Sequence, residues 1–173
     1  MGDYFLSRVA FGKRFAMHMD MDQFDERIIG SDNVPRNKPR LLIIDDDTDF
    51  ISDLSIMLST EFEIFSAATT PEACDRWMEC RPNCVLLDLQ LPEYFGDNPN
   101  TEGIAFLSHM KSDPPRPPIV NTPVVVISAH ADENTDRMVS SLGVKNIYRK
   151  PPDLGQLKET IRKLIFGNTG YPS

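Results

Sequence analysis

The alternation of two kinds of segment between residues 40 and 167 constrains the fold of this chain more than any other feature. Short aliphatic runs, typical of buried strands, occupy residues 40–45, 62–68, 83–89, 122–129 and 145–150. Segments with apolar residues at helical spacing follow them, at residues 48–60, 70–81, 101–113, 132–143 and 152–167. Right-handed crossovers between parallel strands place such helices on both faces of a sheet. The sequence therefore predicts an α/β domain with a five-stranded parallel sheet.

Polar residues and glycine mark the predicted helix ends. Thr48 or Asp49 is available as the N-cap of the first helix. Thr70 is the expected cap of the second helix, with Pro71 in the first turn, where a missing N–H is harmless. Gly143 can end the fourth helix, because glycine adopts the left-handed conformation without strain.

The segment "GSDNVPRNKP" at residues 30–39 has the composition of a linker. We predict an N-terminal extension and linker at residues 1–38, partly disordered, a folded domain at 39–168 and a tail at 169–173. Residues 1–15 are aromatic and weakly basic, so they would form either a short docking helix or a flexible tail.

The net charge of the chain restricts the classes of partner it can bind. A net charge of −8 argues against a nucleic-acid module or a basic membrane-surface patch, because both need clustered Lys and Arg. No apolar run approaches the length of a membrane span. Cys74, Cys80 and Cys84 form no CxxC pair, so we expect reduced, packed thiols. We predict a cytoplasmic chain whose partners are proteins or cations, with no nucleic acid and no membrane among them.

Functional side chains gather where the predicted strands end. Asp45 and Asp46 follow the first strand, Asp88 the third, Ser128 the fourth and Lys150 the fifth. In an open parallel sheet the binding crevice lies beyond these carboxyl ends, so we expect the five side chains to converge. Two carboxylates about 4 Å apart repel by about 4 kcal/mol at an effective dielectric constant of about 20. A proton or a cation must therefore relieve the cluster.

A hard divalent cation suits this cluster. Mg²⁺ typically binds one or two carboxylates, several waters and a phosphate oxygen, which indicates phosphoryl chemistry. Asp88 can act as the nucleophile toward phosphorus and form an acyl phosphate. Lys150 and the Ser128 hydroxyl would neutralise and hold the transferred group. Each residue alone has a simpler account, a capping serine or a surface lysine, but their joint placement at successive strand ends favours the functional one.

Four stretches carry a family resemblance: "LLIIDDD" (41–47), "CVLLDLQLP" (84–92), "PVVVISA" (123–129) and "YRKPP" (148–152). In this order and spacing the chain resembles a response-regulator receiver domain of two-component signalling. The resemblance implies a flavodoxin-like fold with strand order 2-1-3-4-5 and helices on both faces of the sheet.

The resemblance also implies roles for the residues at the strand ends. A histidine kinase or a histidine phosphotransfer protein would phosphorylate Asp88. The Mg²⁺ ion would be held by Asp46, Asp88 and the Gln90 carbonyl, while Asp45 would act largely through water. Gln90 and His130 would tune the hydrolysis of the acyl phosphate, although an exposed loop histidine is an equally good account of His130.

Two departures from the family pattern concern the neighbourhood of the site. Receivers usually carry a glycine four residues after the proline that follows the phosphoacceptor strand, whereas Gly103 comes eleven residues after Pro92. The acidic residues of the inserted loop (93–102), Glu102 among them, would add negative charge near the metal, belong to a lid, or lie in a surface excursion, which we favour.

The second departure lies in the fifth strand. Many receivers carry a switch Tyr or Phe three residues before the strand-end lysine, whereas this chain has Ile147 there. Tyr148 is adjacent, but it points to the other face of a regular strand. The resemblance further implies that Lys150 precedes a cis Pro151.

These observations predict a stand-alone receiver, acting as a phosphorelay intermediate or as an adaptor. It would catalyse only its own phosphorylation and dephosphorylation, and the fourth helix, fifth strand and fifth helix would dock a downstream protein. Two alternatives stay open. One is a receiver-like interaction domain that carries no phosphate. The other is a phosphatase of the haloacid-dehalogenase type, whose DxDx[TV] motif would use Asp45 and Asp47 but requires Thr or Val where Asp49 stands.

Overall fold

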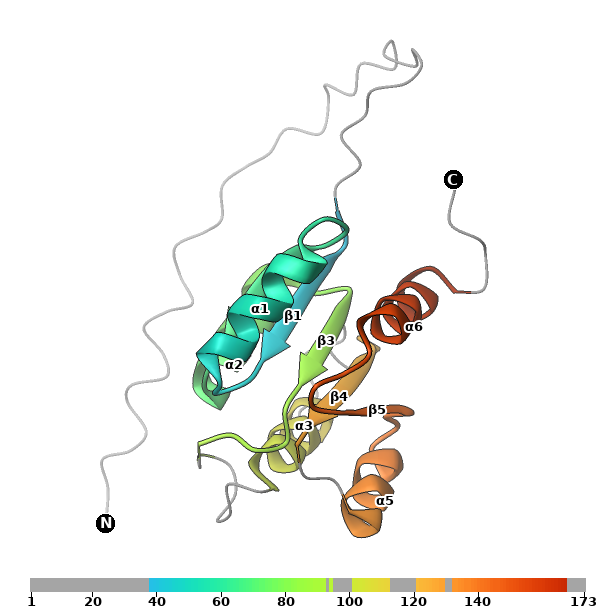
Figure 1. Cartoon of the computed structure of the whole chain (residues 1–173). Helices are drawn as coiled ribbons and strands as arrows, with labels where there is room; N and C mark the ends of the chain where they lie inside the picture. Colours follow the sequence, from blue (N-terminus) through green and yellow to red (C-terminus); the bar gives the residue numbers. More distant parts are fainter. Residues whose placement is uncertain (1–37, 93, 95–100, 113–120, 130–131, 168–173) are drawn as a thin grey trace, which may run out of the picture. The chain divides into compact units, whose positions relative to one another are not determined.

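The computed structural model describes residues 38–92, 94, 101–112, 121–129 and 132–167. Its strands are β1 (Arg40–Ile44), β2 (Glu63–Ala67), β3 (Cys84–Leu87), β4 (Val124–Ser128) and β5 (Asn146–Arg149). They alternate with the helices α1 (Thr48–Leu58), α2 (Thr70–Cys80), α3 (Glu102–Ser112), α5 (Glu133–Ser141) and α6 (Leu154–Phe166) (Figure 1).

All strand pairs of the sheet are parallel, and the strand order is β2-β1-β3-β4-β5. The predicted fold class and strand order are therefore confirmed. The register sets the last residue of β1, Ile44, beside Leu87 of β3 and Ala67 of β2. Because these residues all lie at the carboxyl ends of their strands, the segments that follow them leave the sheet at one edge.

The strand side chains alternate between two apolar clusters, one on each face of the sheet. Leu42 and Ile44 of β1 lie in the first cluster and Leu41 and Ile43 in the second, each at most 1% exposed. Helices α2, α3 and α5 contribute to the first cluster, and helices α1 and α6 contribute to the second. Double coverage explains why the strands are continuously aliphatic rather than alternating with polar residues.

Trp77 of α2, the single tryptophan of the chain, is buried in the first cluster. Its ring centroid lies 6.0 Å from that of Phe106 in α3, with the ring planes tilted by 51°. Aromatic pairs prefer such tilted or offset arrangements. The pair therefore ties the two helices together on this face of the sheet.

The helix caps correct two predictions. Asp47 caps α1, because its backbone is extended (φ −79°, ψ 96°) and its carboxylate accepts hydrogen bonds from the next turn. Thr69, not Thr70, caps α2 for the same reason, with φ −139° and ψ 158°. Gly143 follows α5 with a φ of +82°, a left-handed conformation that suits glycine. This predicted helix end is confirmed.

Among the residues described, the cysteines form no disulfide. Cys80 and Cys84 are buried and Cys74 is half-buried, and burial raises the pKa of the Cys84 thiol to about 12. The same part of the chain contains no helix whose length and apolar character would let it cross a membrane.

Some of the predictions fall outside the described residues. These include His130, the aromatic segment at residues 1–15, most of the inserted loop at 93–102, and nearly all of the proposed extension and tail. The domain boundaries at residues 39 and 168 stay predictions.

Candidate functional site

The register of the sheet brings the two buried aspartates together. Asp45 follows Ile44 and Asp88 follows Leu87, two residues that are paired across β1 and β3. The Asp88 backbone N–H donates to the Ile44 carbonyl over 2.8 Å. The Asp45 N–H donates to the carbonyl of Ala67, the last residue of β2, over 3.1 Å. Backbone hydrogen bonds thus continue the sheet into both aspartates and fix where their side chains begin.

The other side of the site comes from β4 and β5. Ser128 is the last residue of β4, where sequence reasoning placed it just after the strand, and it is fully buried. It pairs with Arg149, and its carbonyl accepts a hydrogen bond of 3.1 Å from the backbone N–H of Lys150. The Lys150–Pro151 peptide bond is cis, as the resemblance implied.

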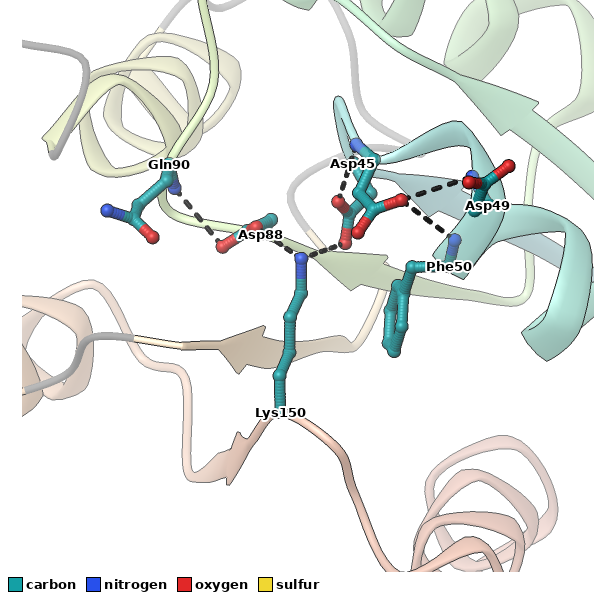
Figure 2. Close-up of polar contacts among 7 residues, drawn as sticks. Asp45, Asp49, Phe50, Asp88, Gln90 and Lys150 are labelled. Atoms are coloured by element: carbon teal, nitrogen blue, oxygen red, sulfur yellow. Dashed lines mark hydrogen bonds and ion pairs between the residues drawn. The ribbon is translucent and has the colours of Figure 1, made fainter.

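Lys150 reaches between the two buried carboxylates (Figure 2). Its Nζ lies 2.6 Å from Asp45 Oδ2 and 2.6 Å from Asp88 Oδ2. The two aspartates are 2% and 3% exposed, so each carboxylate has lost nearly all its contact with bulk water. Buried carboxylates need a compensating charge, and in this structure the Lys150 ammonium provides it.

Burial and pairing shift the protonation equilibria of this group. Burial raises the pKa of Asp45 from 3.8 to about 6, although hydrogen bonds from Lys150 and Asp47 act in the opposite direction. Burial alone would lower the pKa of Lys150, but its hydrogen bonds to Asp45 and Asp88 outweigh that effect and raise it. Lys150 therefore keeps its positive charge at neutral pH.

Asp46 completes a cluster of three acidic side chains. It is exposed, and one carboxylate oxygen from each of Asp45, Asp46 and Asp88 lies within 4.8 Å of the others. A set of carboxylate oxygens at this spacing fits a hard cation such as Mg²⁺, which prefers oxygen ligands. The Gln90 backbone N–H donates to Asp88 Oδ1 over 3.1 Å, so Gln90 lies next to the cluster.

The start of α1 holds Asp45 in place. Asp45 Oδ1 accepts a hydrogen bond of 3.0 Å from the backbone N–H of Asp47. The Asp47 carboxylate in turn accepts from the N–H groups of Asp49 and Phe50, at 3.1 and 3.0 Å. Because the Asp47 side chain is engaged in the helix cap, it is not directed at the cluster as the DxDx[TV] motif of a dehalogenase-type phosphatase would need.

Sequence reasoning missed the burial of Glu102. This residue was expected in a surface loop, yet it is fully buried in the first turn of α3. Its Oε1 accepts a hydrogen bond of 3.0 Å from the hydroxyl of Thr70, which is also fully buried. The bond ties the start of α3 to the start of α2. Nothing in the local sequence indicates this pairing, because the two residues are distant along the chain.

Gly103 packs directly against the backbone at the carboxyl end of β3. A Cβ at this position would lie 2.3 Å from the Asp88 carbonyl oxygen and 2.7 Å from Leu89 Cα, so only glycine fits. The Gly103 N–H also donates to the Leu89 carbonyl over 3.0 Å. The insertion after Pro92 therefore leaves the close approach between α3 and Asp88 intact.

A family model for the response regulator receiver domain matches residues 41–162. The chain belongs to the response-regulator receiver family. Receivers act in two-component signal transduction, where histidine kinases phosphorylate them, and an acidic triad of this kind is typical of their Mg²⁺ site.

Individual relatives agree with this assignment. The transcriptional regulatory protein CrdR of Helicobacter pylori is 30% identical over 104 residues, which are 60% of this chain and 44% of the regulator. This receiver thus spans less than half the length of that relative. Sporulation initiation phosphotransferase F of Bacillus subtilis is 25% identical over 127 residues, 73% of this chain and 93% of its own length.

A solved structure supports the fold. The signal receiver domain of a DNA-binding response regulator from Colwellia psychrerythraea superposes with a TM-score of 0.63 at 24% identity. The match covers 74% of this chain and 98% of that domain.

In this receiver the aromatic residue of β5 is Tyr148, and it lies on the opposite face of the sheet from Ile147. Ile147 packs on the cluster beneath α2, α3 and α5, and Tyr148 packs on the cluster beneath α1 and α6, as predicted. The Tyr148 hydroxyl lies 2.6 Å from Thr160 Oγ1 and donates to the Gln156 carbonyl over 3.3 Å. Tyr148 is therefore held against α6 and does not occupy the position of a receiver's switch aromatic.

Proposed function

We propose that Asp88 accepts a phosphoryl group from a phosphohistidine of a histidine kinase or a histidine phosphotransfer protein, in a Mg²⁺-dependent reaction. The phosphorylated domain then signals by changing its contacts with a downstream protein. The observation that carries this proposal is the environment of the Asp88 carboxylate. This carboxylate is 3% exposed, receives hydrogen bonds from Lys150 and the Gln90 N–H, and lies beside two further carboxylates.

The transfer needs little covalent chemistry from the protein. A carboxylate oxygen of Asp88 attacks the phosphorus atom as the P–N bond to the donor histidine breaks. The electron pair of that bond leaves with the imidazole nitrogen, and an acyl phosphate remains on Asp88. Water later hydrolyses it, so the domain catalyses only its own phosphorylation and dephosphorylation. Lys150 and the Ser128 hydroxyl neutralise and hold the phosphoryl oxygens, because they stand at the ends of the two adjoining strands.

Asp46, Asp88 and the Gln90 carbonyl are the proposed metal ligands, with Asp45 acting largely through water. A bound Mg²⁺ supplies positive charge beside the incoming phosphoryl oxygens. The cluster can accommodate such a charge, because it holds three carboxylates and the Lys150 ammonium pairs with two of them, Asp45 and Asp88.

Two parts of the proposal concern signalling. The downstream protein binds the face formed by α5, β5 and α6, because Lys150 stands at the end of β5 and links that face to the site. The receiver acts alone, as a phosphorelay intermediate or an adaptor. Support for this mode comes from the Bacillus phosphotransferase, in which the matched region makes up 93% of the protein.

Intact mass spectrometry after incubation with acetyl phosphate and Mg²⁺ tests the proposal. The wild type should gain one phosphoryl group, and Asp88→Asn should gain none. Asp49→Asn is a matched control, because Asp49 is an exposed aspartate at the start of α1, and it should label like the wild type.

Labelling of Asp88→Asn at the wild-type level would show that another residue accepts the phosphoryl group. A wild type that binds Mg²⁺ but never labels would favour the interaction domain that carries no phosphate. Continued turnover of a small phosphomonoester would favour the phosphatase.

A further inference from the structure

Lys150 has a third neighbour besides the two carboxylates. Its Nζ lies 4.6 Å from the centroid of the Phe50 ring, within the range of a cation–π interaction. Figure 2 shows the Phe50 ring beside the Lys150 side chain and the carboxylates at the far end of that chain. The ammonium is thus bounded by two anionic groups and one aromatic face.

Phe50 is held in this position from two sides. Its backbone N–H donates to the Asp47 carboxylate over 3.0 Å as part of the α1 cap. Its side chain is half-buried and packs against the apolar cluster beneath α1 and α6. The ring is therefore fixed by the fold and does not depend on Lys150 for its place.

The three neighbours of Lys150 differ in what else they can bind. When Asp45 and Asp88 turn oxygens toward a divalent cation, their negative charge is shared and their attraction for the ammonium weakens. Lysine has a flexible four-carbon stem and a strongly hydrated head, so a weakened pair lets it swing into water. The Phe50 ring is uncharged and no ligand for a hard cation, so its attraction for the ammonium is unaffected.

We propose that Phe50 is a positioning residue that keeps the Lys150 ammonium beside Asp88 while the carboxylates bind a divalent cation. This inference rests on the proposed function, because Lys150 is useful there only if a phosphoryl group arrives. It assigns a task to a side chain of α1 that also packs on the apolar cluster beneath that helix.

Substitutions at residue 50 separate the electrostatic attraction of the ring face from the shape of the ring. Phe50→Leu removes the aromatic face, and incorporation of 4-fluoro-, 3,5-difluoro- and pentafluorophenylalanine keeps the shape while it weakens the negative ring face stepwise. Phe65→Leu is the matched control, because Phe65 is also half-buried but packs on the opposite face of the sheet.

We expect Phe50→Leu to slow phosphorylation by acetyl phosphate at saturating Mg²⁺ roughly 3- to 30-fold. The fluorinated series should slow it in graded steps, while the Mg²⁺ dissociation constant stays unchanged. Phe65→Leu should leave the rate at the wild-type value. Equal rates for Phe50→Leu and Phe65→Leu, or for phenylalanine and pentafluorophenylalanine, would overturn the inference.

A second readout does not depend on phosphorylation. The Lys150 Cε protons should show an upfield ring-current shift in NMR spectra, absent in Phe50→Leu, and the shift should persist when Mg²⁺ is added. Loss of the shift on Mg²⁺ addition would show that Lys150 leaves the ring and would refute the proposal. Failure of the wild type to take up phosphate would instead overturn the proposed function, while this readout would still decide whether Phe50 retains Lys150.

Discussion

Ile43 and Asp45 are two residues apart and almost equally buried, at 1% and 2% exposure, yet burial acts on them in opposite directions. Removing Ile43 from water stabilises the fold by roughly 1.5–3 kcal/mol. Removing Asp45 from water raises its pKa to about 6 and leaves a group that needs Lys150 beside it. Burial of the apolar faces of this sheet stabilises the fold, whereas burial of the charged groups at its carboxyl edge costs free energy.

The largest effect should come from the apolar side of this comparison. Leu86→Ala leaves a cavity in the cluster beneath α1 and α6, where Leu86 is 1% exposed, and should lower the free energy of unfolding by about 2–5 kcal/mol. Urea unfolding followed by circular dichroism measures this loss. Ile56→Ala, at a position 70% exposed, should change it by less than about 0.5 kcal/mol. A small loss for Leu86→Ala would mean that the core is not the main source of stability.

Lys150→Ala tests the polar side. Removing the ammonium leaves two buried carboxylates facing each other and should cost about 3 kcal/mol of stability without Mg²⁺. Added Mg²⁺ should restore much of that loss, because it replaces the missing charge, whereas it should not rescue Leu86→Ala in this way.

Lys163→Ala is the control for Lys150→Ala. It breaks an exposed pair with Glu159 and should cost less than about 1 kcal/mol. Equal stabilisation of the Lys150 and Leu86 variants by Mg²⁺ would remove the distinction between the two regions.

Gly103→Ala probes the place where the two regions meet. The added Cβ would press on backbone atoms of Asp88 and Leu89, which cannot rotate away, and should cost about 1–3 kcal/mol. Phosphorylation by acetyl phosphate should also slow, because Asp88 must shift. Gly155→Ala in α6 is the control, since its Cβ would meet only the tip of the Asp153 side chain, at 3.3 Å. An unchanged Asp88 labelling rate would show that this close approach does not position the carboxylate.

The smallest effect should come from the buried polar pair away from the acidic cluster. Thr70→Val removes the hydroxyl that donates to Glu102 and should destabilise the fold by about 1–2 kcal/mol, while Mg²⁺ affinity stays unchanged. Isothermal titration with Mg²⁺, together with urea unfolding, checks both statements. A loss of Mg²⁺ affinity would show that the Thr70–Glu102 pair, at the starts of α2 and α3, also supports the metal site.

The sequence predicted those features that depend on short-range patterns. Aliphatic runs and helical spacing sufficed for the five strands and helices, and the strand-end rule sufficed to bring Asp45, Asp88 and Lys150 together. The strand order came from the resemblance, because pattern alone leaves the arrangement of strands open.

What the sequence did not reveal depends on backbone angles and on contacts between distant segments. Asp47 and Thr48 are both polar residues at the start of α1, and only the extended backbone of Asp47 decides which one caps the helix. The hydrogen bond between Thr70 and Glu102 and the contact between Phe50 and Lys150 each join residues from separate elements. Local composition carries no signal for such pairs.

Trp77 gives this protein a built-in optical reporter. Because it is the chain's one tryptophan and lies between α2 and α3 against Phe106, its fluorescence responds to repacking on that face of the sheet. Rearrangement around Tyr148 on the opposite face would leave its emission unchanged. Emission spectra taken before and after phosphorylation thus tell whether the Trp77 face of the sheet rearranges.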